Sequence, residues 1–419
     1  MIDTITLLPG VAFRFFRDTR FKQGCISIQF VRPMCKEEAA LNALIPAILM
    51  RGCEGAEDLR AITLKLDDLY GASVGAIVRR IGDYHATGLY AGFISDRFAL
   101  EGDKVLAPMV DFLRQLLLCP VTENGAFSAR YTESEKKNLI SAIESQKNNK
   151  RVYAVNRMYS HMCKEDSLGI PRLGSVEDVK AITPEAAYAH YQKTLRESPV
   201  EIFYVGEAPE QAAALLKAVF STMDREAVAL PAQSNFRSCN AGYVTEQLDV
   251  AQGRLCMGFT TPITTRSGDY VAMQVCNALF GSGMTSKLFV NVREKLSLCY
   301  DVGSSFTGTK GVLLVTSGID FAKEEEAKAE ILRQLDAVQA GDFTEAELQA
   351  AKESLCSSLR GLHDSPSAIE NYYTTASLNG LNLIPADYLA RVEAVTPEQV
   401  AAAAKSLTLD TVYFLKGVQ

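Results

Sequence analysis

The amino-acid sequence predicts an α+β fold made by tandem duplication, in which two homologous domains each place helices over an antiparallel-rich sheet. Three observations lead to this prediction. The chain has 419 residues, which is long for a single hydrophobic core, so at least two domains are expected. Strand-like and helix-like stretches follow the same order in both halves. Two helix-start signals recur at nearly the same offset, as expected for a repeat.

The recurring helix starts are short polar patterns with a known physical role. A capping-box pattern, Thr-x-x-Glu, begins at Thr132 and again at Thr344, which is 212 residues later. The pattern Thr-Pro-Glu, with proline at the first helical position, begins at Thr183 and again at Thr396, which is 213 residues later. Two matched signals at nearly one spacing indicate a duplicated domain of roughly 200 residues.

Apolar periodicity then places the elements of the first half. In chain order we expect a strand at 25–30, helices at 36–50 and 56–70, strands at 73–80 and 84–94, helices at 105–118, from 132 toward 150 and from 183, and a strand at 200–205. Pro46 lies inside the first of these helices, where it is expected to kink the helix or loosen one turn.

The second half repeats this order. The matching elements are a strand at 253–259, helices within 270–295, strands at 297–306 and 311–319, helices from 344 and from 396, and a strand at 411–415. Residues 224–240 show no clear periodicity and contain proline and serine, which indicates a linker. We therefore expect an N-terminal domain at 1–223, a linker at 224–240 and a C-terminal domain at 241–419.

Composition excludes several functional classes. The net charge of −7 and the absence of a basic block argue against nucleic acid and anionic membranes as partners. No apolar run is long enough to span a membrane, and the N-terminal stretch lacks the features of a signal peptide. The ten cysteines are scattered without a Cys-x-x-Cys pair, which favours reduced thiols. We expect a cytoplasmic protein.

The stretch 280–300 carries the clearest candidate chemistry. It opens with a flexible turn that contains Gly281 and Gly283, and a helix-like run follows with Leu288, Val292 and Leu296 on one expected face. No Gly-Lys pair followed by serine or threonine occurs, so the turn does not match a phosphate-binding loop.

Arg293 and Tyr300 lie at the end of this stretch, where the helix passes into a strand. A planar cation and a phenol placed together can hold a peptide carbonyl or a developing oxyanion. The alternative interpretation is a solvated helix end with a hydrogen-bonded tyrosine.

The whole chain resembles the pitrilysin/insulinase-type zinc peptidases, which carry an inverted zinc motif and include mitochondrial processing peptidase and small bacterial relatives. The resemblance implies a processing-peptidase-like metallohydrolase fold whose halves enclose a peptide chamber. It assigns the substrate-gripping arginine and tyrosine to Arg293 and Tyr300. It also implies that Gly281 and Gly283 bind substrate and form flexible backbone at the chamber wall.

The same resemblance implies a motif H-x-x-E-H in the first half, where two histidines bind Zn²⁺ and the glutamate is the general base. Counted back from Gly52, the motif positions fall on Ala43, Pro46 and Ala47, none of which is a ligand. The third ligand is expected at residue 141 or 142, where serine and alanine stand. We therefore expect no metal and no cofactor in this chain.

The leading hypothesis is a non-catalytic subunit that supplies peptide-binding residues to a motif-bearing, zinc-containing partner in a heterodimeric metallopeptidase. The alternative is a catalytically inactive scaffold or a peptide-binding homo-oligomer, so the partner is either a paralogue or a second copy of this chain. A self-sufficient hydrolase with a rearranged site is a third hypothesis. No two of the four histidines are three or four residues apart, and no G-x-S-x-G motif occurs to support it.

Overall fold

A computed structural model describes residues 4–381 and 383–418. The chain divides into two compact units that are not continuous in sequence. Unit 1 contains the chain up to Glu144, Pro171–Ala232 and His363–Leu378. Unit 2 contains Ser145–Ile170, Gln233–Leu362 and the chain from Asn379. Each unit therefore takes one segment from the opposite half of the sequence.

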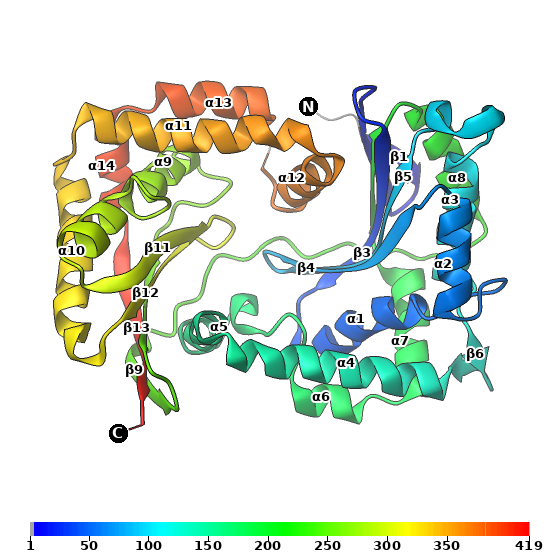
Figure 1. The fold of residues 1–419 in the computed structure, drawn as a ribbon, viewed down its shortest axis with the longest axis horizontal. Helices are drawn as coiled ribbons and strands as arrows, with labels where there is room; N and C mark the ends of the chain where they lie inside the picture. The colour runs from blue at the N-terminus through cyan, green and yellow to red at the C-terminus, as the bar shows by residue number, and fades with distance from the viewer. Residues whose placement is uncertain (1–3, 382, 419) are drawn as a thin grey trace. The chain divides into compact units, whose positions relative to one another are not determined.

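Unit 1 is built on a six-stranded sheet with the order β1-β2-β8-β3-β5-β4 (Figure 1). Its neighbouring strands are antiparallel except for the parallel pair β2 and β8. The strands are β1 (Thr4–Leu8), β2 (Val11–Arg17), β3 (Gln23–Pro33), β4 (Ser73–Ile81), β5 (Tyr84–Ile94) and β8 (Val200–Gly206), and a short hairpin pairs β6 (Thr122–Glu123) with β7 (Ala126–Phe127).

The helices of unit 1 cover both faces of this sheet (Figure 1). They are α1 (Lys36–Leu49), α2 (Leu59–Asp68), α3 (Leu106–Leu118), most of α4 (Ala129–Asn148), α6 (Val176–Ala181), α7 (Pro184–Glu197), α8 (Pro209–Ser221) and α12 (Pro366–Leu378). Side chains of β3 alternate between the faces. Ile26 and Ile28 join the main core with α1, α3 and α8, whereas Cys25 and Gln29 contact α12.

Unit 2 contains a five-stranded sheet with the order β11-β12-β10-β13-β9. Its strands are β9 (Gly242–Leu248), β10 (Gly253–Thr260), β11 (Cys299–Thr307), β12 (Val312–Ile319) and β13 (Thr408–Gly417). Its helices are α5 (Lys150–Met162), α9 (Tyr270–Phe280), the π-helix η4 (Leu288–Lys295), α10 (Glu324–Ala340), α11 (Glu345–Gly361), α13 (Pro385–Ala394) and α14 (Pro397–Lys405).

The sheet topology confirms the predicted α+β duplication. The order β8-β3-β5-β4 in unit 1 matches β13-β10-β12-β11 in unit 2. In both units one additional strand pairs in parallel with the last strand of the repeat, β2 with β8 and β9 with β13. The same set of four strands and the same parallel neighbour therefore recur in each half of the chain.

Equivalent helices of the two repeats are exchanged between the units. Helix α5 comes from the first half and packs in unit 2, where Met158 and Met162 lie against Gly258 of β10. Helix α12 comes from the second half and packs in unit 1. There Glu370 is fully buried and accepts two hydrogen bonds of 2.9 Å from the guanidinium of Arg79. The helix exchange is a tertiary feature that the sequence did not reveal.

Three of the four predicted helix starts are confirmed. Thr183, Thr344 and Thr396 cap α7, α11 and α14, and the last two form complete capping boxes. The prediction at Thr132 is wrong, because α4 begins three residues earlier, at Ala129. The hydroxyl of Thr132 is buried inside the helix and has no hydrogen-bond partner within 4–381 and 383–418, and Glu135 contacts Arg51 instead of capping.

Helix α1 continues through Pro46 to Leu49. Among the described residues none of the ten cysteines forms a disulfide, and seven of them are buried. Within residues 4–381 and 383–418, no helix combines the length and the apolar character needed to cross a bilayer.

The two threonines provide a matched test of the corrected helix boundary. Thr344→Val should lower the free energy of unfolding by about 1 kcal/mol, because the first turn of α11 loses its side-chain acceptor. Thr132→Val keeps the shape and removes only an unpartnered buried hydroxyl, so it should not lower stability. Urea unfolding of both variants measures the difference, and an equal loss in the two would contradict the assigned helix starts.

Candidate functional site

The glycine-rich turn joins α9 to the start of η4 and lies against β11. A Cβ atom at Gly281 would come within 2.5 Å of the Ser304 hydroxyl oxygen, and the Ser304 amide donates to the Gly281 carbonyl at 2.9 Å. Gly283 has a φ of +126°, which disfavours any residue with a side chain. Both glycines are therefore required by the backbone path, one for space and one for conformation.

Arg293 lies on a π-helix, a rare form that occurs often at functional sites. The Leu296 amide donates to the Asn291 carbonyl five residues earlier, at 3.2 Å, so the turn is wider than in an α-helix. As predicted, Leu288 and Val292 are buried, but the prediction for Leu296 is wrong because the wider turn leaves it 46% exposed. Leu298 is buried instead.

The Arg293 side chain is partly exposed, and its guanidinium lies over the Phe289 ring at 4.6 Å from the ring centre. Such a cation–π contact restrains the long side chain without occupying its hydrogen-bond donors. An adjacent carboxylate, Glu294, is 3.5 Å away. The planar donors of Arg293 thus remain available to a ligand while the side chain stays oriented.

Tyr300 lies at a β-bulge in β11, the edge strand of the unit 2 sheet. Cys299 pairs with Ile319 and Asp301 pairs with Gly318, so Tyr300 is the extra residue without a cross-strand partner. Bulges redirect side chains and occur next to active sites. The bulge leaves Tyr300 61% exposed.

The Tyr300 hydroxyl donates to Asp320 Oδ1 at 3.0 Å, and this hydrogen bond raises the pKa of the phenol. Tyr300 is therefore protonated at neutral pH and able to donate. A substrate carbonyl would have to displace Asp320 as the acceptor. Sequence reasoning missed Asp320, because its contact with Tyr300 depends on the bulge and not on a local motif.

The structure brings Arg293 and Tyr300 together in one open cavity of about 430 Å³. Asp320 and Lys323 also line it, so the cavity contains charges of both signs. Gly281 and Gly283 line a different cavity of about 360 Å³. Phe289 lines this second cavity and supports Arg293 of the first, so the four predicted residues fall into two neighbouring sites within unit 2.

The positions of the inverted zinc motif lie on α1 in unit 1. Ala43 and Pro46 are buried, and Ala47 is half-buried. None of these side chains carries a metal-binding atom, so the residues present do not fit a zinc ion. Among residues 4–381 and 383–418, no group of three or more histidine, cysteine, aspartate or glutamate side chains is arranged to bind a metal.

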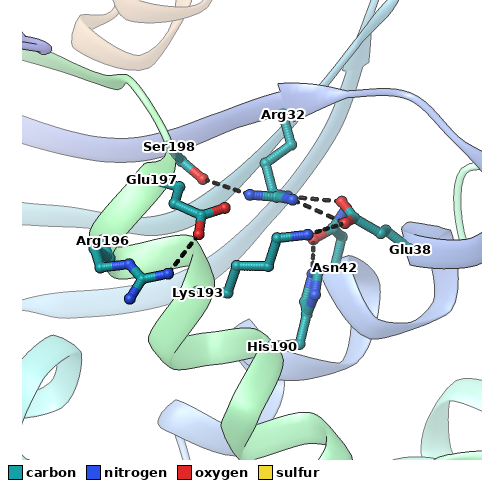
Figure 2. Close-up of polar contacts among 8 residues, drawn as sticks. All are labelled: Arg32, Glu38, Asn42, His190, Lys193, Arg196, Glu197 and Ser198. Carbon is teal, nitrogen blue, oxygen red and sulfur yellow. Dashed lines mark hydrogen bonds and ion pairs between the residues drawn. The ribbon is translucent and has the colours of Figure 1, made fainter. Parts of the chain in front are cut away.

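A network of polar side chains fastens α1 to its neighbours instead (Figure 2). Arg32 of β3 donates two hydrogen bonds to Glu38 of α1, at 2.7 and 2.8 Å, and Lys193 of α7 donates a third at 3.1 Å. Burial raises the pKa of Glu38, but these donors outweigh it and lower the pKa to about 2. His190 of α7 is 2.8 Å from Asn42 of α1.

Two of the four histidines are buried in unit 1. His190 contacts Asn42, whereas neither ring nitrogen of His85, on β5, has a hydrogen-bond partner among the residues that the structure describes. Burial lowers the pKa of both to about 4, so both are neutral at pH 7. They therefore act as structural core residues. The other two, His161 and His363, contact aromatic rings of Tyr413 and Phe16.

Comparisons with known proteins find relatives that are described as inactive peptidases. The family described as "Peptidase M16 inactive domain" matches residues 181–355. A Bacillus subtilis protein named "Probable inactive metalloprotease YmfF" is 29% identical over 98% of this chain and 96% of its own length. A conserved protein from Enterococcus faecalis superimposes with a TM-score of 0.92 at 28% identity, over 100% of this chain and 99% of that one.

A solved peptidase M16 inactive domain from Pseudomonas fluorescens shares the fold. It superimposes with a TM-score of 0.83 at 20% identity and covers 100% of this chain and 98% of that one. Both superpositions cover 100% of this chain. They therefore include both units and the two exchanged helices, α5 and α12.

The buried histidines predict a specific pH dependence of stability. A histidine whose folded pKa is below its unfolded value of about 6.5 loses stabilising free energy as the pH falls toward the folded pKa. Unfolding free energy should therefore decrease between pH 6.5 and pH 4, by about 3 kcal/mol for each histidine. His85→Leu should remove about half of this decrease.

Urea unfolding at steps between pH 8 and pH 4 tests the effect. The comparison at pH 8 isolates any packing change caused by the substitution, because neither residue 85 nor His190 is charged in either protein at that pH. An unchanged slope between pH 6.5 and pH 4 in His85→Leu would contradict the neutral, buried state of His85.

Proposed function

We propose that this chain, which is similar to M16 peptidases but has no zinc ligand at the motif positions, is the non-catalytic subunit of a two-subunit metallopeptidase. The chain would supply a peptide-binding site to a paralogue that carries the complete zinc motif. Zinc and the water it activates would belong to the partner, so this chain contributes only binding and orientation.

One observation carries the proposal: two backbone irregularities meet at the cavity of Arg293 and Tyr300. The π-helix places Arg293 and the bulge places Tyr300, and both side chains line that cavity. Regular elements would have been sufficient for packing alone. Departures of this kind are typical of functional sites. A pure scaffold has no need to expose a phenol and a guanidinium in one cavity.

The two residues would act on different parts of a bound peptide. Arg293 can hold main-chain carbonyl groups with several donors, and its contact with Phe289 limits the entropy lost on binding. Tyr300 can donate a hydrogen bond to the carbonyl oxygen that becomes more negative during cleavage. Asp320 would hold the hydroxyl until substrate replaces it, because it accepts that hydrogen bond in the free chain.

Single substitutions in the two-chain complex test these roles. Tyr300→Phe should reduce cleavage of a quenched peptide by roughly 100-fold or more, which is the usual cost of losing an oxyanion donor. Arg293→Ala should reduce it by about tenfold or more, because a charge-assisted hydrogen bond to the peptide is worth about 1.5–3 kcal/mol. Lys295→Ala is the matched control on the same π-helix, where Lys295 contacts only Asn291 at 3.0 Å among the described residues. It should leave cleavage nearly unchanged.

Size-exclusion chromatography should show that all three variants assemble with the partner as the wild type does. Undiminished cleavage by assembled Arg293→Ala would contradict the proposed role of Arg293. Loss of assembly without any peptide effect would favour the scaffold function instead.

A further inference from the structure

The second cavity of unit 2 lies between the glycine-rich turn, strand β11 and the first turn of α5. Its volume of about 360 Å³ falls within the usual range for ligand pockets, which is about 300–1,000 Å³. Gly281, Ser282 and Gly283 form one wall, and Ser304 and Ser305 of β11 form another. The cavity is separate from that of Arg293 and Tyr300, and Phe289, which lines it, contacts Arg293 of the first cavity.

Arg151 is the only charged residue among those that line this cavity. It is exposed and lies in the first turn of α5, next to the capping residue Asn149. Within the part of the chain that the structure describes, no ion pair or hydrogen bond engages the Arg151 side chain. A guanidinium in a concave site without a carboxylate partner favours the binding of an anion.

The rest of the lining suits a carboxylate. The hydroxyls of Ser282 and Ser305 have no hydrogen-bond partner among the described residues, and each can donate to an oxygen atom. No acidic side chain lines the cavity to repel a negative group. Met284, which is 77% exposed, and Phe289 add apolar surface that could contact the adjoining part of a peptide.

The two cavities follow one strand. Tyr300 at the start of β11 lines the first, and Ser304 and Ser305 further along the same strand line the second. A peptide held at Arg293 and Tyr300 could therefore extend beside β11 toward Arg151.

We propose that Arg151, with Ser282 and Ser305, binds a carboxylate of the peptide, either its C-terminal group or an acidic side chain. This inference rests on the proposed peptide-binding function and adds a preference to it. Peptides that place a carboxylate beyond the segment held by Arg293 and Tyr300 would bind more tightly than neutral ones.

Binding of labelled peptide pools to the purified chain tests the proposal by fluorescence anisotropy. Three pools of randomised ten-residue peptides without Asp or Glu at the random positions are compared. One ends in a free carboxylate, one is C-terminally amidated with a fixed Glu, and one is amidated with a fixed Gln. The wild type should bind at least one carboxylate pool about tenfold more tightly than the neutral pool.

Arg151→Gln should abolish this preference and leave binding of the neutral pool unchanged. Lys150→Gln is the matched control, since it removes the neighbouring charge, whose amine contacts the Lys147 carbonyl at 2.8 Å and does not line the cavity. It should keep the preference. The pool that is preferred shows whether the cavity binds the chain end or an acidic side chain.

Equal binding of all three pools by the wild type would overturn the proposal, as would a preference that survives in Arg151→Gln. Neither outcome affects the proposed function, which depends on the loss of cleavage in Arg293→Ala. Conversely, a carboxylate preference that depends on Arg151 would stand even if Arg293→Ala cleaved normally in the complex.

Discussion

Ion pairs with buried carboxylates hold the two exchanged segments in place. These segments contain α5 and α12, and each completes a unit built mainly from the other half of the chain. In unit 1, Glu370 of α12 is fully buried against Arg79 of β4. In unit 2, Asp166 follows α5 and is 3.2 Å from Lys310, and both side chains are almost fully buried. Removing one partner of such a pair leaves a buried charge and is strongly destabilising. Neither unit is therefore completed by a continuous half of the chain, because each sheet is covered in part by a helical segment that crosses from the other half.

The candidate site lies where the second repeat departs from the first. Strand β4 pairs with β5 in unbroken register, whereas the equivalent strand β11 contains the bulge at Tyr300. The helix before β4 is an ordinary α-helix, α2, whereas the segment before β11 is the π-helix that carries Arg293. The duplicated fold thus provides a rigid frame. The two copies differ in backbone geometry at the position of the candidate site.

The first repeat has no metal-binding side chain at the motif positions. Its α1 helix carries Ala43, Pro46 and Ala47 at the motif positions, and ion pairs of Glu38 with Arg32 and Lys193 fasten that helix. These contacts stabilise the fold but provide no Lewis acid and no general base. One half carries no metal-binding side chain at the motif positions, and the other presents Arg293 and Tyr300 in one cavity.

Local signals explain what the sequence predicted well. Thr344 caps its helix because a hydroxyl three residues before a glutamate acts within one turn, and alternating apolar residues placed the central strands. Thr132 has the same pattern but lies within α4. A motif of two residues contains no information about how far a helix extends before it, so the pattern could not show that α4 begins earlier. Leu296, Asp320 and the exchange of α5 and α12 depend on a π-turn, a bulge and tertiary packing, none of which has a local signal.

Peptide cleavage by separate and mixed chains tests the central claim most directly. A mixed pool of quenched peptides is incubated with the purified, zinc-replete chain, with and without a chelator, and then with a motif-bearing paralogue added. We expect no turnover by this chain alone and, once both are present, chelator-sensitive turnover that exceeds that of the paralogue alone. Chelator-sensitive turnover by the pure chain, or no gain on mixing, would contradict it.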